Sequence, residues 1–357
     1  MKQLRVAIIG QGRSGRNIHG RYLLSDPERF KVVAAVDELE ERRVRAASEY
    51  EGCDTYADYR ELLGRKDIDL VVNSSYSHLH VPISIDLLNH GFNVLCEKPL
   101  ARTVEEVDRV AEAAEKSGKV FAVFQQSRYA PYFQQVKKVV DSGVLGRIVQ
   151  ISIAFNGFAR RWDWQCIQDM YGGNLLNTGP HPVDQALQFF GQDTMPRVLC
   201  FMDRVNTFGD AEDYVKLILS GPGKPVIDLE ISSCCAYPHF TYNIQGSQGG
   251  LNGNMKHIDW KYFKPEEAPE QKLISEPLFK EDRTPAYCGE KLTWYEESWD
   301  VPERQSDLFH TISGAYYSML YKTLTEGAPL EVTLEQVRQQ IAVIEECHRQ
   351  NPLPKKS

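Results

Sequence analysis

The first third of the chain alternates short apolar runs with segments whose apolar residues recur at helical spacing. Apolar runs without polar alternation are typical of parallel strands that are buried on both faces. Thr103 followed by Glu106 is a capping box, which predicts the start of one of the intervening helices. The pattern predicts a doubly wound α/β domain in residues 1–124. Its strands are expected at residues 4–9, 31–36, 69–73, 93–96 and 120–124, and its clearest helices at 77–90 and 103–117.

Beyond residue 124 the pattern changes to strands in which apolar and polar residues alternate. Such strands, joined by turns, are typical of an antiparallel sheet with one packed face and one free face. The turn signals are Gly221-Pro222-Gly223 and Gly249-Gly250. Residues 125–357 are therefore expected to form an α+β domain with an open, mainly antiparallel sheet and no long flexible linker. Its strands are predicted at 148–154, 198–202, 214–219, 226–231, 242–245 and 257–263, and its helices at 182–190, 307–325 and 333–349.

Composition and charge narrow the class of protein. Of the 357 residues, 42% are hydrophobic and 25% are charged, as in ordinary globular proteins. The formal charge of −8 provides no bulk attraction to nucleic acid or to an anionic membrane. No apolar run approaches the roughly 18 to 20 residues that span a bilayer, and no signal-peptide pattern is found, so we expect a cytoplasmic protein without nucleic-acid or membrane partners. The eight cysteines include no CxxC pair and no zinc spacing, which favours reduced thiols and no metal site.

A glycine-rich turn follows the first predicted strand and opens a helix. It consists of Gly10, Gln11, Gly12, Arg13, Ser14 and Gly15. Glycines at this spacing permit a tight turn, close approach of a pyrophosphate and close packing of helix on strand. Asp37 ends the second predicted strand, close to the ~20-residue offset at which a carboxylate holds the ribose hydroxyls of NAD. Together these residues predict a dinucleotide site.

The residues around Asp37 bear on the choice of cofactor. Asp37 favours NAD, because its carboxylate repels the additional 2′-phosphate of NADP. Arg42 and Arg43 leave NADP open as a second cofactor. The alternative for both arginines is a solvated helix face, stabilised by Glu38 and Glu40.

Four further stretches carry a resemblance to a known family. They are Ser74-Ser75-Tyr76-Ser77-His78-Leu79-His80, Glu97-Lys98-Pro99, Arg128-Tyr129-Ala130-Pro131 and the run from Gly172 to Asp184. With the glycine turn and Asp37, in this order and spacing, they resemble the Gfo/Idh/MocA oxidoreductases, which include glucose-fructose oxidoreductase and inositol 2-dehydrogenase. The resemblance covers nearly the whole chain. It implies a Rossmann domain followed by an α/β domain whose open sheet often forms a dimer or tetramer interface, so a homo-oligomer is expected.

The resemblance also implies a reaction. Family members usually move a hydride between a nicotinamide ring and a sugar, polyol or related carbinol. Lys98 and His181 correspond to the lysine and histidine that lie beside the reacting carbon. Besides the glycine turn and Asp37, the residues expected at the cofactor are Ser75, Tyr76, His80, Glu97 and Lys98.

Lys98 and His181 suit this chemistry on physical grounds. Oxidising a carbinol requires a base for the hydroxyl proton, and a histidine with a near-neutral pKa supplies one, so His181 is the candidate base. Lys98 follows a parallel strand and can hydrogen-bond the substrate oxygen, which stabilises alkoxide character. Without the resemblance, His181 is more readily a structural or capping residue, and Lys98 a surface lysine or a salt-bridge partner of Glu97.

One position departs from the family pattern. Many members place an aspartate four residues before the histidine, where this chain has Asn177. A neutral amide orients a partner but carries no charge, which implies a weaker base, a changed substrate or another proton route. Asp184 is a candidate for the missing carboxylate, or an acidic residue that favours a helix start. Asn177 and Asp184 therefore join the candidate catalytic residues.

A segment rich in groups that contact carbohydrate precedes the Gly172-Gly173 turn. Indole faces pack on the C–H surfaces of sugars, while Arg, Asp and Gln side chains meet hydroxyl or acidic groups. The alternative is a structural loop whose tryptophans pack in the core. The candidate substrate residues are Arg161, Trp162, Asp163 and Trp164 of this segment, with Asn177, His181 and the weaker candidates Arg128 and Tyr129.

Three functions fit these residues. The first is an NAD(P)-dependent oxidoreductase that acts on CH–OH groups of a sugar, polyol or sugar derivative. The second uses the same cofactor to cleave a glycosidic bond by transient oxidation and elimination, with no net redox change. The third is a non-catalytic dinucleotide-binding sensor, whose measurable function would survive the Lys98→Ala and His181→Ala substitutions. The presence of both residues favours an enzyme.

Overall fold

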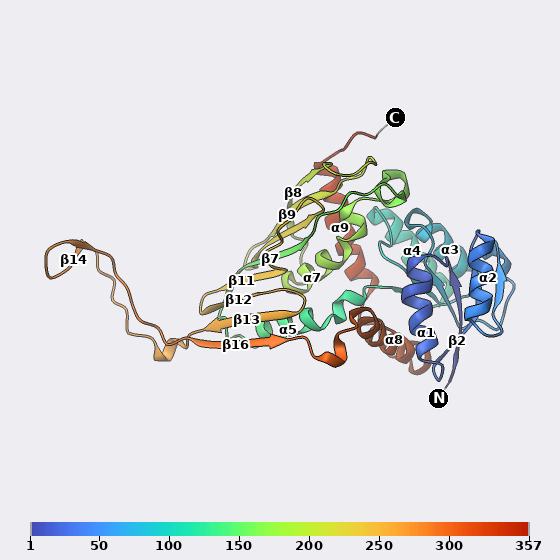
Figure 1. Ribbon diagram of the computed structural model, residues 1–357, viewed down its shortest axis with the longest axis horizontal. Helices are drawn as coiled ribbons and strands as arrows, with labels where there is room; N and C mark the ends of the chain where they lie inside the picture. Colours follow the sequence, from blue (N-terminus) through green and yellow to red (C-terminus); the bar gives the residue numbers. More distant parts are fainter. Residues whose placement is uncertain (1, 356–357) are drawn as a thin grey trace.

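The computed structural model describes residues 2–355, which form two sheet-containing domains linked by helices (Figure 1). The strands of the N-terminal sheet are β1 (Leu4–Ile9), β2 (Phe30–Val36), β3 (Asp54–Tyr56), β4 (Leu70–Asn73), β5 (Val94–Cys96) and β6 (Phe121–Val123). All of them are parallel, in the order β3-β2-β1-β4-β5-β6. The strand order reverses between β1 and β4, which is the Rossmann arrangement and places the ligand crevice at the carboxyl ends of these two strands. The predicted doubly wound domain is confirmed.

The five strands predicted for this domain are present within two residues of their expected ends, and β3 is additional. It has three residues, none of them fully buried, and it pairs with the edge of β2. A strand so short and so exposed leaves no apolar run in the sequence, which is why the hydrophobic pattern did not indicate it.

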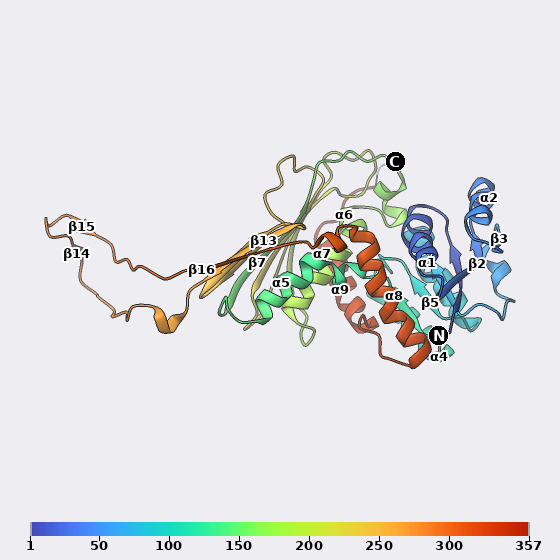
Figure 2. The ribbon, with the colours of Figure 1, turned by 60° about the horizontal axis from the view of Figure 1, so that its bottom comes forward.

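Helices cover both faces of the N-terminal sheet, as Figure 2 also shows. The predicted capping box is present at the start of α4, where Thr103 accepts from the backbone of Glu106 and Glu106 returns the bond. The predicted helix at residues 77–90 begins as a short 3₁₀ turn and becomes α-helical at His80. The helical elements are a π-helix (Arg13–Gly20), α1 (Arg21–Ser25), α2 (Glu40–Glu49), α3 (His80–Asn89) and α4 (Val104–Ser117), with 3₁₀ turns at Tyr59–Leu62, Ser77–Leu79 and Gln126–Tyr129.

The second domain is built on an eight-stranded mixed sheet, which confirms the predicted open, mainly antiparallel arrangement. Its strands are β7 (Ile148–Asn156), β8 (Arg197–Asp203), β9 (Tyr214–Ser220), β10 (Val226–Ser232), β11 (Tyr242–Gly246), β12 (Gly249–Gly253), β13 (His257–Tyr262) and β16 (Tyr295–Asp300). Their order is β16-β13-β12-β11-β7-β10-β9-β8, and the β7–β10 pair is parallel while the other neighbours are antiparallel.

Helices cover one face of this sheet and leave the other face open (Figure 2). The alternation predicted from the sequence is visible in β9, where Val215, Leu217 and Leu219 are buried and their neighbours are partly exposed. The two C-terminal helices return to the first domain, where Tyr317 stacks on Tyr22 with ring centroids 5.0 Å apart. The helices are α5 (Pro131–Asp141), α6 (Asn174–Asn177), α7 (Pro180–Phe190), α8 (Leu308–Glu326) and α9 (Leu334–Gln350), with 3₁₀ turns at Trp164–Cys166, Gln168–Met170, Pro265–Glu267 and Glu303–Gln305.

The prediction of a turn at Gly249-Gly250 was wrong, because both residues lie in β12. A Cβ on Gly249 would lie 2.2 Å from the carbonyl oxygen of Lys261 on the neighbouring strand. Glycine is therefore required here because two strands approach each other closely. Close backbone approach, like a turn, is a common reason for glycine in a sheet.

Residues 264–294 form an arm that leaves the sheet between β13 and β16 and projects far from the body (Figures 1 and 2). Its outer end is a short hairpin of β14 (Leu278–Phe279) and β15 (Pro285–Ala286). No long linker was expected in this domain, and the arm corrects that prediction. Leu273 is 96% exposed and Tyr287 is fully exposed, so the arm does not bury them within this chain.

Two further properties concern the whole described chain. Within residues 2–355, no helix is both long and apolar enough to cross a bilayer. All eight cysteines are free thiols, including the neighbours Cys234 and Cys235.

Candidate active site

The glycine turn lies at the carboxyl end of β1, where the strand order reverses. Gly10 has a φ of +85°, a left-handed conformation that favours glycine. A Cβ on Gly10 would lie 2.4 Å from the carbonyl oxygen of Ser74, and a Cβ on Gly15 would lie 1.7 Å from the carbonyl oxygen of Gly10. Only glycine therefore allows the π-helix to begin this close to the two strands.

The turn fits a dinucleotide. The N-terminus of a helix offers free backbone N–H groups and a positive dipole end to a pyrophosphate. The Nε2 atom of Gln11 is buried there without a hydrogen-bond partner in the described chain. A Cβ on Gly12 would meet only the Arg42 guanidinium, 3.7 Å away, so the backbone is open on that side. The helix begins with Arg13, which is exposed, and Ser14.

Asp37 lies beside the glycine turn, as its spacing predicts. Its Oδ2 atom accepts from the backbone N–H of Gln11 at 2.7 Å, and its Oδ1 atom accepts from Leu39 at 3.0 Å. The carboxylate is thereby fixed at the end of β2, where it can meet the ribose hydroxyls of NAD.

Arg42 and Arg43 do not form the solvated face that the alternative interpretation described. The Arg42 guanidinium lies 3.3 Å from Oδ2 of Asp37, and Arg43 donates to the carbonyl oxygens of Asp37 and Glu38. Both side chains turn back to the loop after β2, where carboxylate and carbonyl oxygens accept their hydrogen bonds. Arg42 is thus a cation at the ribose end of the nucleotide site.

The residues after β4 line the opposite side of the crevice. Ser75 donates its hydroxyl to Asn73 at 2.7 Å, and the Tyr76 ring packs edge-on against Trp164 of the second domain, with ring centroids 5.2 Å apart. The buried ring of His80 lies between two carbonyl oxygens, 2.7 Å from that of Pro99 and 3.1 Å from that of Ser75. His80 therefore ties the loop after β4 to the turn after β5, and burial lowers its pKa.

Glu97 is held by a buried residue that the sequence analysis did not select. Its Oε1 atom lies 3.2 Å from Nε2 of His19 in the π-helix, and its Oε2 atom accepts from the backbone N–H of Lys98 at 3.1 Å. His19 in turn lies 2.7 Å from the Tyr317 hydroxyl of α8. Burial raises the pKa of Glu97, but the His19 bond and nearby positive charge outweigh it and bring the pKa to about 2. The sequence signal that could have identified His19 is its position in the helix that follows the glycine turn.

Lys98 connects the two domains. Its Nζ atom donates to the carbonyl oxygen of Asn177 at 2.7 Å. Burial lowers the pKa of Lys98, because a buried ammonium loses the water that stabilises its charge. The same peptide segment carries His181 four residues later, so this bond brings the two predicted catalytic side chains to one place.

His181 is the second residue of α7, and its backbone N–H donates to Thr178 at 3.1 Å. Its Nδ1 atom is buried without a hydrogen-bond partner in the described chain. Burial and the neighbouring Lys98 charge lower its pKa from 6.5 to about 3. The imidazole is therefore neutral at physiological pH, the state that a general base requires.

Asn177 acts through two different groups. Its main-chain carbonyl receives Lys98, while its side-chain Nδ2 donates to the carbonyl oxygen of Gln165 at 2.9 Å. The side chain thus holds the segment that contains Gln165, and the contact with Lys98 would exist with any residue at this position.

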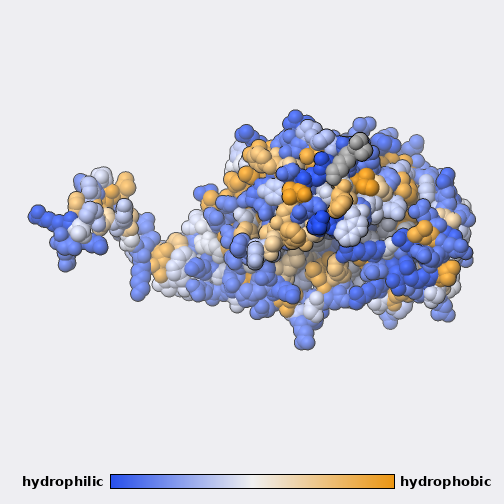
Figure 3. All heavy atoms as spheres, turned by 45° about the horizontal axis from the view of Figure 1, so that its top comes forward, coloured by the Kyte–Doolittle hydropathy of each residue, from blue (hydrophilic) through white to orange (hydrophobic). Residues whose placement is uncertain are grey.

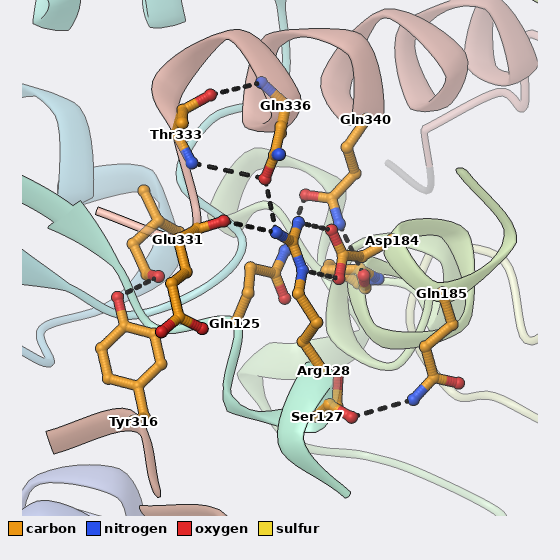
Figure 4. Close-up of polar contacts among 12 residues, drawn as sticks. Gln125, Ser127, Arg128, Asp184, Gln185, Tyr316, Glu331, Thr333, Gln336 and Gln340 are labelled. Carbon is orange, nitrogen blue, oxygen red and sulfur yellow. Dashed lines mark hydrogen bonds and ion pairs between the residues drawn. The ribbon is translucent and has the colours of Figure 1, made fainter. Parts of the chain in front are cut away.

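Asp184 does not replace the missing carboxylate near His181. Both of its oxygens receive the Arg128 guanidinium, at 3.0 Å from Nε and 2.5 Å from NH2, and both side chains are buried (Figure 4). Arg128 also donates to the Glu331 carbonyl and to the Gln336 side chain. A carboxylate that is saturated by a guanidinium is a poor proton carrier, so we leave Asp184 out of the catalytic group.

Arg128 and Tyr129 likewise have structural partners rather than a free approach to substrate. Figure 4 shows Arg128 enclosed between α7 and the start of α9. The Tyr129 hydroxyl donates to Glu331 at 2.7 Å. Both residues fasten the C-terminal helices to the chain between the domains.

The segment at 161–164 spreads its side chains in different directions. Trp164 packs on Tyr76 across the domain boundary, and Asp163 caps the following 3₁₀ turn by accepting from Gln165 at 2.9 Å. Trp162 is 79% exposed, so the core-packing alternative does not apply to it. Arg161 is half-buried and lies 4.0 Å from Asp163.

Two family profiles match the chain. The one described as "Oxidoreductase family, NAD-binding Rossmann fold" matches residues 4–125, and the "GFO/IDH/MocA C-terminal domain" matches residues 133–252. Together they span more than half of the sequence, in the order of the two domains described above.

Known proteins similar to this chain include enzymes and uncharacterized oxidoreductases. One of the latter, from Schizosaccharomyces pombe, is 30% identical over 63% of this chain and 62% of its own length, a little under two thirds. The scyllo-inositol 2-dehydrogenase (NADP(+)) of Bacillus subtilis is 24% identical over 96% of this chain and 92% of its own. An NAD-binding protein from Listeria innocua has a solved structure that superposes over all of both chains with a TM-score of 0.79 at 20% identity.

Proposed function

Because the chain belongs to the GFO/IDH/MocA oxidoreductase family and carries its NAD-binding Rossmann domain, we propose that it transfers a hydride between NAD(P) and a CH–OH or carbonyl carbon of a sugar, polyol or sugar derivative. The observation that carries this proposal is the bond from Lys98 to the main chain of Asn177, which brings Lys98 and His181 together. The similarity to an inositol dehydrogenase supports a polyhydroxylated substrate.

In this proposal NAD(P), held by the glycine turn and Asp37, would supply the hydride-transfer chemistry when bound. His181 takes the proton of the substrate hydroxyl during oxidation and returns it during reduction, because its imidazole is neutral at physiological pH. Lys98 donates a hydrogen bond to the same substrate oxygen and stabilises its developing negative charge. The Asn177 carbonyl and Glu97 hold the lysine in place from either side.

The pKa shifts predict the pH dependence of kcat/KM. The His181 pKa of about 3 means that the base stays neutral as the pH falls through 6.5, where an ordinary histidine would become charged. We therefore expect no loss of kcat/KM between about pH 8 and pH 5 that follows a histidine titration. At high pH, kcat/KM should begin to decline at a pH below 10.5, the ordinary pKa of lysine. The reason is that burial lowers the pKa of Lys98. A decline centred near pH 6.5 that disappears in His181→Asn would contradict this assignment.

The proposed reaction is tested by following reduced nicotinamide at near-ultraviolet wavelengths while NAD, and separately NADP, is mixed with sugars, inositols and glycosides. A rise that depends on His181 and Lys98 supports a dehydrogenase. Consumption of a glycoside without a rise supports transient oxidation and elimination instead. Dinucleotide binding without any conversion, unchanged in Lys98→Ala and His181→Ala, supports the sensor.

We also propose that the chain forms a homo-oligomer through its second domain. The open face of the eight-stranded sheet is not covered by any helix of the described chain (Figure 2). The arm of residues 264–294 stands clear of the body and carries apolar side chains into solvent (Figure 3). Exposed apolar groups on a projecting segment are typical of a protein interface. Trp294 and Tyr295 fix the base of the arm through the rings of Phe263 and Tyr262, so its direction is set by the sheet.

Deleting residues 268–291 and closing the gap with a short Gly-Ser linker is expected to lower the mass measured by light scattering after size exclusion. The reason is that the deletion removes Leu273, Phe279 and Tyr287 from the interface. Tyr287→Ser should weaken the assembly in the same direction. Val44→Ser, which changes an exposed apolar residue on α2 of the first domain, serves as the control. An unchanged mass for the deletion variant would rule the arm out of the interface.

A further inference from the structure

A chain of three buried polar side chains runs from α8 to the main chain of Lys98. The Tyr317 hydroxyl lies 2.7 Å from Nδ1 of His19, and Nε2 of His19 lies 3.2 Å from Oε1 of Glu97. The other carboxylate oxygen of Glu97 accepts from the backbone N–H of Lys98 at 3.1 Å. The chain therefore joins three segments that are distant in the sequence: α8, the π-helix that follows the glycine turn, and the end of β5.

These contacts fix the orientation of the His19 ring. Glu97 has a pKa of about 2 and is ionised at neutral pH, so its carboxylate can only accept and Nε2 of His19 must donate to it. The Tyr317 hydroxyl occupies the second ring nitrogen. Phe124 packs against the ring, with ring centroids 4.4 Å apart. With both nitrogens bonded and Phe124 beside it, the imidazole is held in one orientation.

The chain is built to hold Glu97 rather than to carry protons to water. The side chain of His19 has no exposed area, that of Glu97 is 5% exposed, and Tyr317 is fully buried. Burial raises the pKa of Tyr317 well above 10, so its hydroxyl keeps its proton at physiological pH. A buried chain that ends in a protonated tyrosine can orient its members but cannot exchange protons with bulk solvent.

Tyr317 is anchored by the packing of α8 on the first domain. Its ring stacks on Tyr22 of α1 with centroids 5.0 Å apart and meets Phe30 of β2 edge-on at 5.4 Å. Figure 1 shows α8 beside α1, and both α1 and the π-helix contact it. This packing places a hydroxyl from the C-terminal part of the chain against the helix that begins at the glycine turn.

We propose that His19 and Tyr317 are positioning residues for the proposed hydride transfer. By fixing Glu97 they set the main chain of Lys98, so the helix at the glycine turn and α8 jointly decide where the Lys98 ammonium lies. This inference rests on the proposed function and adds two residues to its site. Lys98 is held at two points, because its backbone donates to Glu97 and its Nζ atom donates to the Asn177 carbonyl at 2.7 Å. A displacement of about 1 Å at such a group can lower the rate about 10²-fold.

The first experiment removes one hydroxyl from the full-length protein. Tyr317→Phe keeps the ring and its packing but leaves Nδ1 of His19 without its partner. Both kcat and KM are measured with the dinucleotide and the sugar or polyol that the wild type converts. We expect kcat to fall about ten- to a hundredfold while KM stays within about threefold, because alignment of Lys98 is lost and no contact to substrate is removed.

Tyr316→Phe is the matched control. Tyr316 precedes Tyr317 on α8, is equally buried, and donates its hydroxyl to the carbonyl oxygen of Val123 in β6 at 2.7 Å. Each substitution deletes one hydroxyl and leaves one buried partner unsatisfied, so both should lower the urea denaturation midpoint to a similar extent. Only Tyr317→Phe should lower kcat. An equal loss of kcat in the two variants, or no loss in Tyr317→Phe, would overturn the inference and leave the proposed reaction intact.

Two further variants test the route through Glu97. Adding Tyr317→Phe to Glu97→Gln should change kcat little beyond Glu97→Gln alone, since residues that act in one chain are not additive. Losses that multiply would show that Tyr317 acts by another route, against the inference. His19→Gln, which retains a donor for the carboxylate, should keep more of the wild-type kcat than His19→Leu does. Equal losses in these two variants would also contradict a positioning role.

Amide hydrogen exchange tests the same link without turnover. The π-helix begins at the glycine turn and carries His19 near its other end. NADH should therefore slow exchange in α8 around residues 313–321 of the wild type, an effect lost in Tyr317→Phe and kept in Tyr316→Phe. No slowing in NADH-bound wild type would overturn the inference. Slowing without conversion of any compound would refute the proposed reaction but support the link, and failure to bind NADH would refute both.

Discussion

Substitution of His181 by asparagine is expected to lower kcat/KM by about 10²- to 10⁴-fold, the range typical for loss of a general acid–base group. Asparagine keeps a polar side chain of similar size but cannot take up the hydroxyl proton. NADH affinity, measured by fluorescence titration, should stay close to wild type, because the glycine turn and Asp37 are untouched. Lys98→Met should cause a loss of similar size, since it removes the donor to the substrate oxygen.

The matched control is His90→Asn, which changes an exposed histidine at the end of α3. It should leave kcat/KM within about twofold of wild type, since surface substitutions rarely disturb a distant site. Retention of full activity by His181→Asn, with a folded protein and an unchanged substrate, would refute His181 as the base. Loss of NADH binding in that variant would instead assign the residue to the cofactor site.

The second large effect is expected on stability. Asp184→Asn should lower the free energy of unfolding by about 3–5 kcal/mol, because it leaves the buried Arg128 guanidinium without its counter-charge. The pair is enclosed, with side-chain exposures of 9% for Arg128 and 4% for Asp184. The change is measured as a shift of the urea denaturation midpoint. Asp108→Asn, which breaks an exposed pair with Arg338, should cost only about 0–1 kcal/mol.

The same variant separates the two interpretations of Asp184. As a structural residue, it should give a less stable protein whose kcat/KM, measured well below the unfolding temperature, remains close to wild type. A proton-carrying residue would give the opposite result, with a large loss of kcat/KM and little loss of stability. Stabilisation by the double substitution Arg128→Met and Asp184→Leu, relative to Asp184→Asn alone, would confirm that the unpaired charge is the cause.

The sequence by itself determined most of the fold and the outline of the site. Continuous apolar runs in the first domain and alternating apolar and polar residues in the second distinguished a parallel from an antiparallel sheet. Burial on two faces and burial on one face leave these different patterns. The glycine turn was predictable for a similar reason: Gly10 has a positive φ and Gly15 packs on the carbonyl of Gly10, so both constraints act within the turn itself. Lys98 and His181 were chosen through the family resemblance, and the structure brings them to one place.

Only the tertiary structure decided which polar residues face one another. Arg128 and Asp184 lie 56 residues apart, and nothing near either one in the sequence indicates that they saturate each other. His19, Glu97 and Tyr317 come from three distant segments, so their network exists only once α8 has packed on the first domain. The direction of the arm is likewise a property of assembled elements. Hydrophobic periodicity is a local signal, whereas charge compensation depends on which segments meet in space, and that is why the fold was predictable and the roles of individual side chains were not.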